Sequence, residues 1–215
     1  MNNLENIVPQ VLHVGSGAWW AEYNLVAAGW KNPPALEVVP HAQTDPRWKT
    51  HLLGASYQTI GGWGCAMVCA CMVYTQHDPT ITPDEFNTIL KDRGGFNYLN
   101  GEAHLAWDRL PDIFPALSWR GRKDWTRRLT ASEIDDIFAK VAVRPLVMWV
   151  DFKPTTSRLD THFVLATERD GDDLVIIDPW DSERSKLLER YALQGQDLAR
   201  AVWGYREIVV KDAVG

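Results

Sequence analysis

The chain has few cysteines, no long apolar run and no excess of basic residues, and each of these absences excludes a class of protein. All three cysteines fall within seven residues, so they cannot form the disulfide framework of a small secreted domain. No apolar run approaches the ~20 residues that a membrane-spanning helix needs. The N-terminus lacks the basic start and apolar core of a secretory signal. We therefore expect a protein of the reducing cytoplasm, or of a particle released from it.

Composition and charge narrow the class further. Apolar residues make up 46% of the 215 positions and charged residues 23%, as in a folded globular domain. The formal net charge of -6 offers no basic surface that would follow phosphates, so no nucleic-acid partner is expected. The 11 tryptophans are many for this length. We expect most of them to pack in the core and loops, with a groove for sugars or extended peptides as the alternative.

The character of the sequence changes near residue 40. Residues 1–40 mix Gly, Ala and Trp with few charges, and they do not make a convincing core by themselves. We expect this segment to be an extension that links or docks, either onto the main domain or onto a partner chain. Residues 41–215 are expected to form the main domain.

Two capping boxes predict helices in the main domain. Thr82 followed by Glu85 predicts a helix that ends at the next pair of glycines. Thr130 followed by Glu133 predicts a second helix, ended by a proline. A further short helix is predicted over residues 102–110.

After the second capping box the pattern of apolar residues changes to one that is typical of β-strands. We predict strands over residues 146–150, 161–167, 174–178 and 202–210. Helices come first and an antiparallel sheet second, which indicates the α+β fold class.

The most informative stretch is a glycine-rich turn that leads directly into Cys65. Residues 66–74 are small and apolar enough to be a buried helix, and the glycines before Cys65 remove side chains where the chain must turn. The free N–H groups and the macrodipole at a helix N-terminus favour a negative charge, which lowers the pKa of a thiol and makes it nucleophilic. Packing in the core is the plainer interpretation of such a cysteine. Whether it is instead a nucleophile depends on the residues that surround it.

The partner residues come from a predicted hairpin. His162 begins one strand, Asp178 ends the next, and a turn lies at residues 170–172. A three-residue loop would place Val164 opposite Asp178, with His162 on the same face. A two-residue Asp-Gly turn would place Asp178 on the other face. The hypothesis therefore requires an odd loop or a bulge. Asp178 would then accept a hydrogen bond from the imidazole, whose other nitrogen would face the thiol.

Cys65, His162 and Asp178 are thus candidates for a nucleophile, a general base and an orienting carboxylate. A tetrahedral intermediate also needs donors for its oxyanion, and the backbone N–H of Cys65 and the side-chain amide of Gln43 are the candidates. The plainer interpretations are an interior strand residue for His162, a turn carboxylate for Asp178 and a water contact for Gln43.

The two remaining cysteines, Cys69 and Cys71, are assigned to packing. Cys65 and Cys69 lie one helical turn apart and, with Cys71 and a histidine, could imitate a zinc site. The run is a single apolar helix in which Cys71 would point elsewhere. We therefore expect no metal and no cofactor.

Taken in order, these residues resemble the papain-like cysteine peptidases. The branch most similar is that of the bacteriocin-leader-processing peptidases and their stand-alone relatives in bacteria and phages. The resemblance covers roughly residues 41–180. It implies a papain-like fold, in which N-terminal helices, including the nucleophile helix, pack on a C-terminal antiparallel sheet. It also implies that Cys65 is the nucleophile, His162 the base, Asp178 the orienting residue and Gln43 the oxyanion donor. The segments that carry it are Gln43 to Trp48, Leu53-Gly54, Gly64 to Met67, His162 to Val164 and Ile177 to Pro179.

The activity implied by the resemblance is hydrolysis of a peptide amide bond through a thioester. One alternative is a phage or bacterial peptidoglycan endopeptidase or amidase carried in a virion. Another is a catalytically inactive structural or interaction module, because family members often carry a hydroxyl residue shortly after the cysteine, where this chain has Val68 and Cys69. Acyl transfer uses the same three residues and differs only in what intercepts the thioester.

Overall fold

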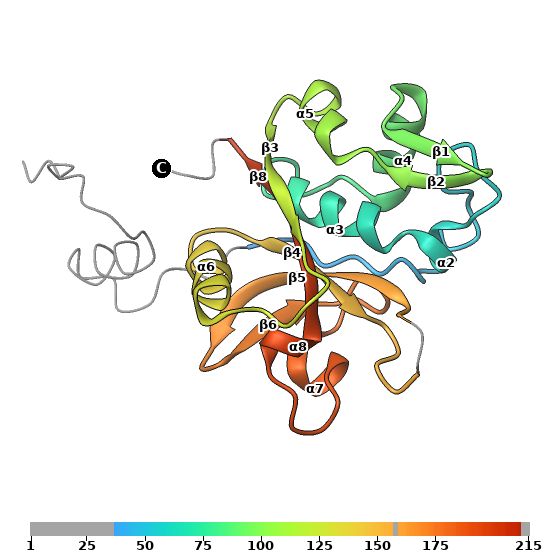
Figure 1. The fold of residues 1–215 in the computed structure, drawn as a ribbon. Coiled ribbons are helices and arrows are strands. Elements are labelled where there is room, and N and C mark those ends of the chain that lie inside the picture. Colours follow the sequence, from blue (N-terminus) through green and yellow to red (C-terminus); the bar gives the residue numbers. More distant parts are fainter. Residues whose placement is uncertain (1–36, 157–158, 212–215) are drawn as a thin grey trace, which may run out of the picture.

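The structure is a computed structural model that describes residues 37–156 and 159–211 (Figure 1). Apart from residues 37–40, the predicted N-terminal extension lies outside the described residues, so its role stays a prediction. The described residues form a six-stranded antiparallel sheet, a separate two-stranded hairpin and several helices, which confirms the α+β fold class. None of the helices in these residues has the length and apolar character needed to cross a bilayer.

The large sheet has the strand order β3-β8-β4-β5-β6-β7. The predictions of β4, β5, β6 and β8 are confirmed, whereas β3 and β7 were not foreseen. β3 is an edge strand whose residues are largely polar, and a bulge near Gly121 interrupts its pairing, so it lacks the alternation typical of a strand. The strands are β3 (Leu117–Asp124), β4 (Leu146–Asp151), β5 (Thr161–Asp170), β6 (Asp173–Ile177), β7 (Arg184–Lys186) and β8 (Val202–Val210).

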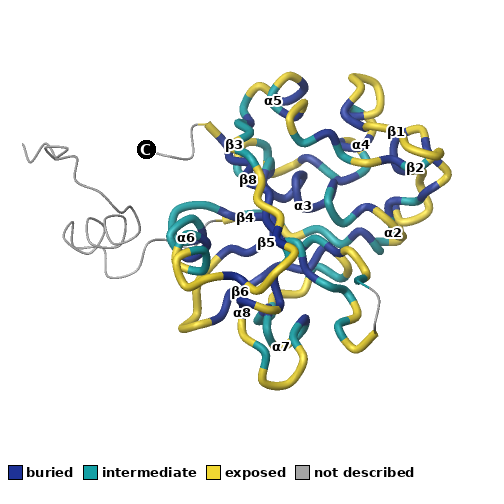
Figure 2. Tube along the Cα trace, viewed as in Figure 1, coloured by how far each residue is buried: buried dark blue, intermediate teal, exposed yellow. Residues whose placement is uncertain are grey.

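Helices cover both faces of this sheet. Helix α3 (Cys65–Tyr74) packs on one face, where it forms a core with Val147, Leu165 and Ile208. Helices α6 (Ala131–Val141), α7 (Leu187–Tyr191) and α8 (Leu198–Ala201) cover the other face. Figure 2 shows the buried residues following α3 and the central strands. Because most of α3 is enclosed, its sequence is apolar all round rather than amphipathic.

Both predicted capping boxes are present. In each, the threonine side chain accepts from the backbone N–H three residues later, while the glutamate accepts from the N-cap backbone. They begin helices α4 (Pro83–Asp92) and α6.

The predicted helix over residues 102–110 is wrong. The chain instead forms a hairpin of β1 (Phe96–Leu99) and β2 (Glu102–Leu105), followed by the 3-10 helix η1 (Trp107–Arg109) and α5 (Leu110–Ile113). Asn100 and Gly101 form the turn with φ angles of 52° and 81°. Asn-Gly with positive φ at both residues is the strongest short hairpin signal, and it outweighs the helical pattern.

The hairpin of β5 and β6 reaches the required register by the second of the two expected routes. The loop has two residues, since Asp170 pairs with Asp173, and a bulge then shifts the register between Ala166 and Glu168. Beyond the bulge Leu165 pairs with Ile177, and continuing this register puts Val164 opposite Asp178. The bulge, not a three-residue loop, therefore brings Asp178 to the start of β5.

The turn before Cys65 includes the short helix α2 (Ile60–Trp63), and Gly64 follows it as the N-cap of α3. A Cβ atom at Gly64 would lie 2.5 Å from the Ile60 carbonyl oxygen. We therefore expect Gly64→Ala to lower the free energy of unfolding by about 1–3 kcal/mol, measured by urea denaturation. Gly62→Ala is the matched control, because its Cβ would meet only Thr59 Oγ1 at 3.3 Å. Equal stability of the two variants would contradict this account.

Candidate active site

Cys65 is the first residue of α3 and is half-buried. The N-cap, Gly64, has no side chain to cap the helix, so no side chain competes with the thiol for the N–H groups of the first turn. The His162 side chain and the backbone of Phe163 and Ala66 all act to lower the pKa of this thiol. The helix and β5 thus supply its partners together.

His162 lies at the start of β5 and is 4% exposed. Its Nε2 is 2.9 Å from Asp178 Oδ1, which leaves Nδ1 as the ring nitrogen for the thiol. The ring of Phe152 lies 4.8 Å from the imidazole and that of Tyr191 lies 5.6 Å from it, both measured between centroids. These rings keep water from the imidazole–carboxylate hydrogen bond.

Asp178 directly follows β6, and its side chain is fully buried. Oδ1 accepts from His162 Nε2 and from the backbone N–H of Trp180 at 2.8 Å. Oδ2 accepts from the Tyr191 hydroxyl and forms an ion pair with Arg190 Nε at 2.7 Å. Both oxygens of this buried carboxylate are therefore satisfied, as a buried charge requires.

The pKa values of the three residues shift in the directions that suit a nucleophile. Burial raises the pKa of the Asp178 carboxyl, but the hydrogen bond and charge of His162 outweigh it and the pKa is lowered. Burial lowers the pKa of His162, yet the bonds to Asp178 and Cys65 raise it to about 9. Burial raises the pKa of the Cys65 thiol, but the bond and charge of His162 bring it below its usual value. Both shifts favour the charged thiolate–imidazolium pair over the neutral pair.

Gln43 is 2% exposed and ties two parts of the site together. Its backbone N–H donates to the Pro179 carbonyl, one residue after Asp178, at 2.5 Å. Its side-chain Nε2 donates to the Gly61 carbonyl, in the turn before Cys65, at 2.9 Å. Only one of the two Nε2 hydrogens is used in this bond. The amide is thus held between the nucleophile turn and the Asp178 loop, with one donor remaining.

The other two cysteines lie deeper in α3. Cys69 and Cys71 are both fully buried, and burial raises the pKa of each thiol well above its usual value. The Cys69 thiol donates to the Phe163 carbonyl at 3.5 Å. The part of the chain that the structure describes holds no cluster of three or more His, Cys, Asp or Glu arranged for a metal ion.

Four residues around the site were not singled out from the sequence: Phe152, Trp180, Arg190 and Tyr191. The last two end α7, a helix of five residues that begins without a side-chain cap and therefore left no start signal. Trp180 is 38% exposed, and Trp63, two residues before Cys65, is 60% exposed. Only the pairing of β6 with the segment after it brings Arg190 and Tyr191 to Asp178.

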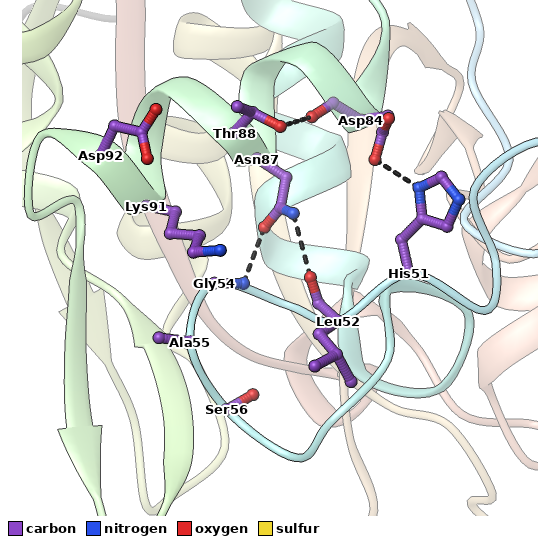
Figure 3. Close-up of a pocket in the computed structure, with 10 residues that line it drawn as sticks. All are labelled: His51, Leu52, Gly54, Ala55, Ser56, Asp84, Asn87, Thr88, Lys91 and Asp92. Atoms are coloured by element: carbon purple, nitrogen blue, oxygen red, sulfur yellow. Dashed lines mark hydrogen bonds and ion pairs between the residues drawn. The ribbon is translucent and has the colours of Figure 1, made fainter.

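A hollow of about 320 Å³ lies elsewhere, between residues 51–56 and α4 (Figure 3). Asn87 crosses it by accepting from the Gly54 N–H and donating to the Leu52 carbonyl. His51 pairs with Asp84 at its rim, with 2.6 Å between Nδ1 and Oδ1. The side chain of Asn87 thus fastens the loop to the helix, and the lining residues include no candidate catalytic residue.

Compared with protein-family models, curated proteins and solved structures, the chain matches none of them. A functional assignment therefore depends on the geometry of the site.

Proposed function

We propose that this protein is a cysteine hydrolase that cleaves a peptide amide bond through a thioester intermediate. The observation that carries the proposal is the 2.9 Å hydrogen bond between His162 Nε2 and the fully buried Asp178 carboxylate, on an imidazole that lowers the pKa of the half-buried Cys65 thiol. In this proposal Cys65 is the nucleophile, His162 the general acid and base, and Asp178 the residue that orients the imidazole.

Each proton has a defined place in the proposed reaction. The Cys65 thiolate attacks the carbonyl carbon, and the oxyanion receives hydrogen bonds from the Cys65 N–H and the free Nε2 hydrogen of Gln43. The imidazolium gives its proton to the leaving amine as the C–N bond breaks, which leaves a thioester. His162 then takes a proton from water, and the resulting hydroxide attacks the thioester. A carboxylic acid is released and the thiolate–imidazolium pair returns.

A cysteine at the N-terminus of a helix, with histidine and aspartate on a facing antiparallel sheet, also supports a papain-like fold. Peptides are the substrate class we propose. Peptidoglycan stem peptides contain the same amide bond, and incubation with cell-wall sacculi tests that alternative by the release of fragments. An inactive module would keep the fold but has no need of an activated thiol.

The experiment that tests the proposal is the pH dependence of Cys65 alkylation by iodoacetamide. The pKa of His162 is raised to about 9, so the imidazolium persists at neutral pH and is lost only as pH rises through that value. The pKa of Cys65 is lowered from that of an ordinary thiol, so the thiolate persists to lower pH than an ordinary thiolate does, ~8.5 being the usual pKa. We expect rapid labelling that extends well below that pH in the wild-type protein.

His162→Ala is the control variant for this titration. Without the imidazolium, the burial of the thiol is no longer opposed, and the midpoint of labelling is expected to rise to that of an ordinary thiol or above. Slow labelling of the wild-type protein, unchanged in His162→Ala, would contradict the proposal and favour a binding or structural role.

A further inference from the structure

Oδ2 of Asp178 contacts two side chains outside the proposed catalytic residues, a tyrosine hydroxyl and an arginine guanidinium. Oδ1 faces His162, while Oδ2 accepts from the Tyr191 hydroxyl and forms an ion pair with Arg190 Nε at 2.7 Å. Tyr191 is 2% exposed, and its ring packs beside the imidazole. Within the described residues neither group is hydrogen-bonded to the thiol, so each would act through Asp178.

A buried carboxylate with one unbound oxygen has two ways to fail as an orienting group. It can rotate about its Cβ–Cγ bond and lose its alignment with the imidazole. It can also take up a proton, because burial disfavours the charged form. Donors on Oδ2 oppose both changes, and the positive charge of Arg190 additionally favours the carboxylate.

Arg190 also holds the loop from which Asp178 projects. Its guanidinium binds the Asp181 carboxylate through Nη2 and lies 3.7 Å from Glu183 Oε2 through Nη1. The backbone closes the same loop, since Asp178 N–H donates to the Glu183 carbonyl at 3.0 Å. The loop includes Pro179, whose carbonyl receives the Gln43 N–H. The arginine therefore holds the segment on which both the carboxylate and the amide depend.

We propose that Arg190 and Tyr191 are positioning residues that keep the Asp178 carboxylate ionised and aligned with His162. The inference rests on the function proposed above. The charged and titratable groups around Asp178 are His162 from β5, Arg190 and Tyr191 from α7, and Cys69 from α3. Asp181 and Glu183, from the loop of Asp178 itself, pair with Arg190. Loss of either group weakens the stabilisation of the imidazolium by Asp178. A less stable imidazolium in turn stabilises the Cys65 thiolate less.

The test is the midpoint pH of iodoacetamide labelling in Tyr191→Phe, Arg190→Gln and Arg190→Lys. We expect the midpoint to rise by about one pH unit in Tyr191→Phe and Arg190→Gln, toward that of an ordinary thiol. Arg190→Lys keeps the charge but not the planar guanidinium, so its labelling midpoint should lie between those of the wild-type protein and Arg190→Gln. Tyr191→Phe keeps the ring, and its fold is checked by thermal unfolding.

Tyr205→Phe is the matched control, because this buried tyrosine also donates its hydroxyl to a carboxylate, Asp136 Oδ2 at 3.0 Å. Its labelling midpoint should equal that of the wild-type protein. If Tyr191→Phe and Arg190→Gln also keep the wild-type midpoint, or lower it, the positioning role is overturned while the proposed function stands. If wild-type labelling is slow and His162→Ala does not change it, both the positioning role and the proposed function are overturned.

Discussion

Replacement of Cys65 by alanine or serine is expected to reduce amide hydrolysis by about four orders of magnitude or more. Alanine removes the nucleophile altogether. Serine keeps its size but brings a hydroxyl that the imidazolium cannot hold as an anion at neutral pH. The loss should appear in kcat when cleavage of a peptide mixture is followed by the release of new amino groups.

Cys71→Ala is the matched control for this prediction. It removes a thiol from the same helix, but one that is fully buried and whose pKa is raised well above its usual value. We expect Cys71→Ala to lose some stability and to retain the activity of the wild-type protein. Full activity in Cys65→Ala or Cys65→Ser would exclude thioester chemistry at this site.

Replacement of Asp178 by alanine is expected to affect both stability and catalysis. The change leaves Arg190 and His162 without the carboxylate that they share, and loss of one partner of a buried ion pair costs about 3–5 kcal/mol. With the imidazole no longer held in one tautomer, kcat should fall by about 10⁴-fold. Urea denaturation and the same peptide cleavage assay measure the two effects.

The pH dependence of stability gives this prediction a second readout. The pKa of Asp178 is lowered in the folded state, so its contribution to stability is present above the unfolded pKa of about 3.9 and is lost as pH falls through the lower folded value. The wild-type protein and Asp178→Ala should therefore differ most near neutral pH and converge in acid.

Glu207→Ala separates the structural part of this effect from the catalytic part. Glu207, on β8, is also a buried carboxylate, and it pairs with Lys140 of α6 and with Arg144 just after that helix, apart from the proposed catalytic residues. We expect it to lose stability while kcat is retained. An Asp178→Ala variant that keeps wild-type kcat would show that the carboxylate has no part in orienting His162.

Much of the architecture was predictable from the sequence, because its signals are local. Threonine and glutamate three residues apart mark the starts of α4 and α6 by side-chain capping. β-Branched, aromatic and other apolar residues dominate β4, β6 and β8, since these strands are largely buried. Asn100-Gly101 was an equally local signal, and the helix predicted over residues 102–110 came from overlooking it.

The candidate catalytic residues were also visible as types in a given order, but their approach to one another was not. The hairpin alone was compatible with Asp178 on either face, and the bulge between Ala166 and Glu168 decided the register. A bulge depends on how two strands pack within the whole sheet, so it leaves little trace in the sequence of one strand.

The sequence by itself determined the starts of α3, α4 and α6, four of the six strands of the large sheet and the chemistry available to the site. Only the tertiary structure decided which groups surround that chemistry. Arg190 and Tyr191 lie on a five-residue helix and reach Asp178 because β6 returns through β7 to α7. Their contacts are long-range, and the energy of a buried carboxylate depends on every donor around it rather than on its neighbours in the chain.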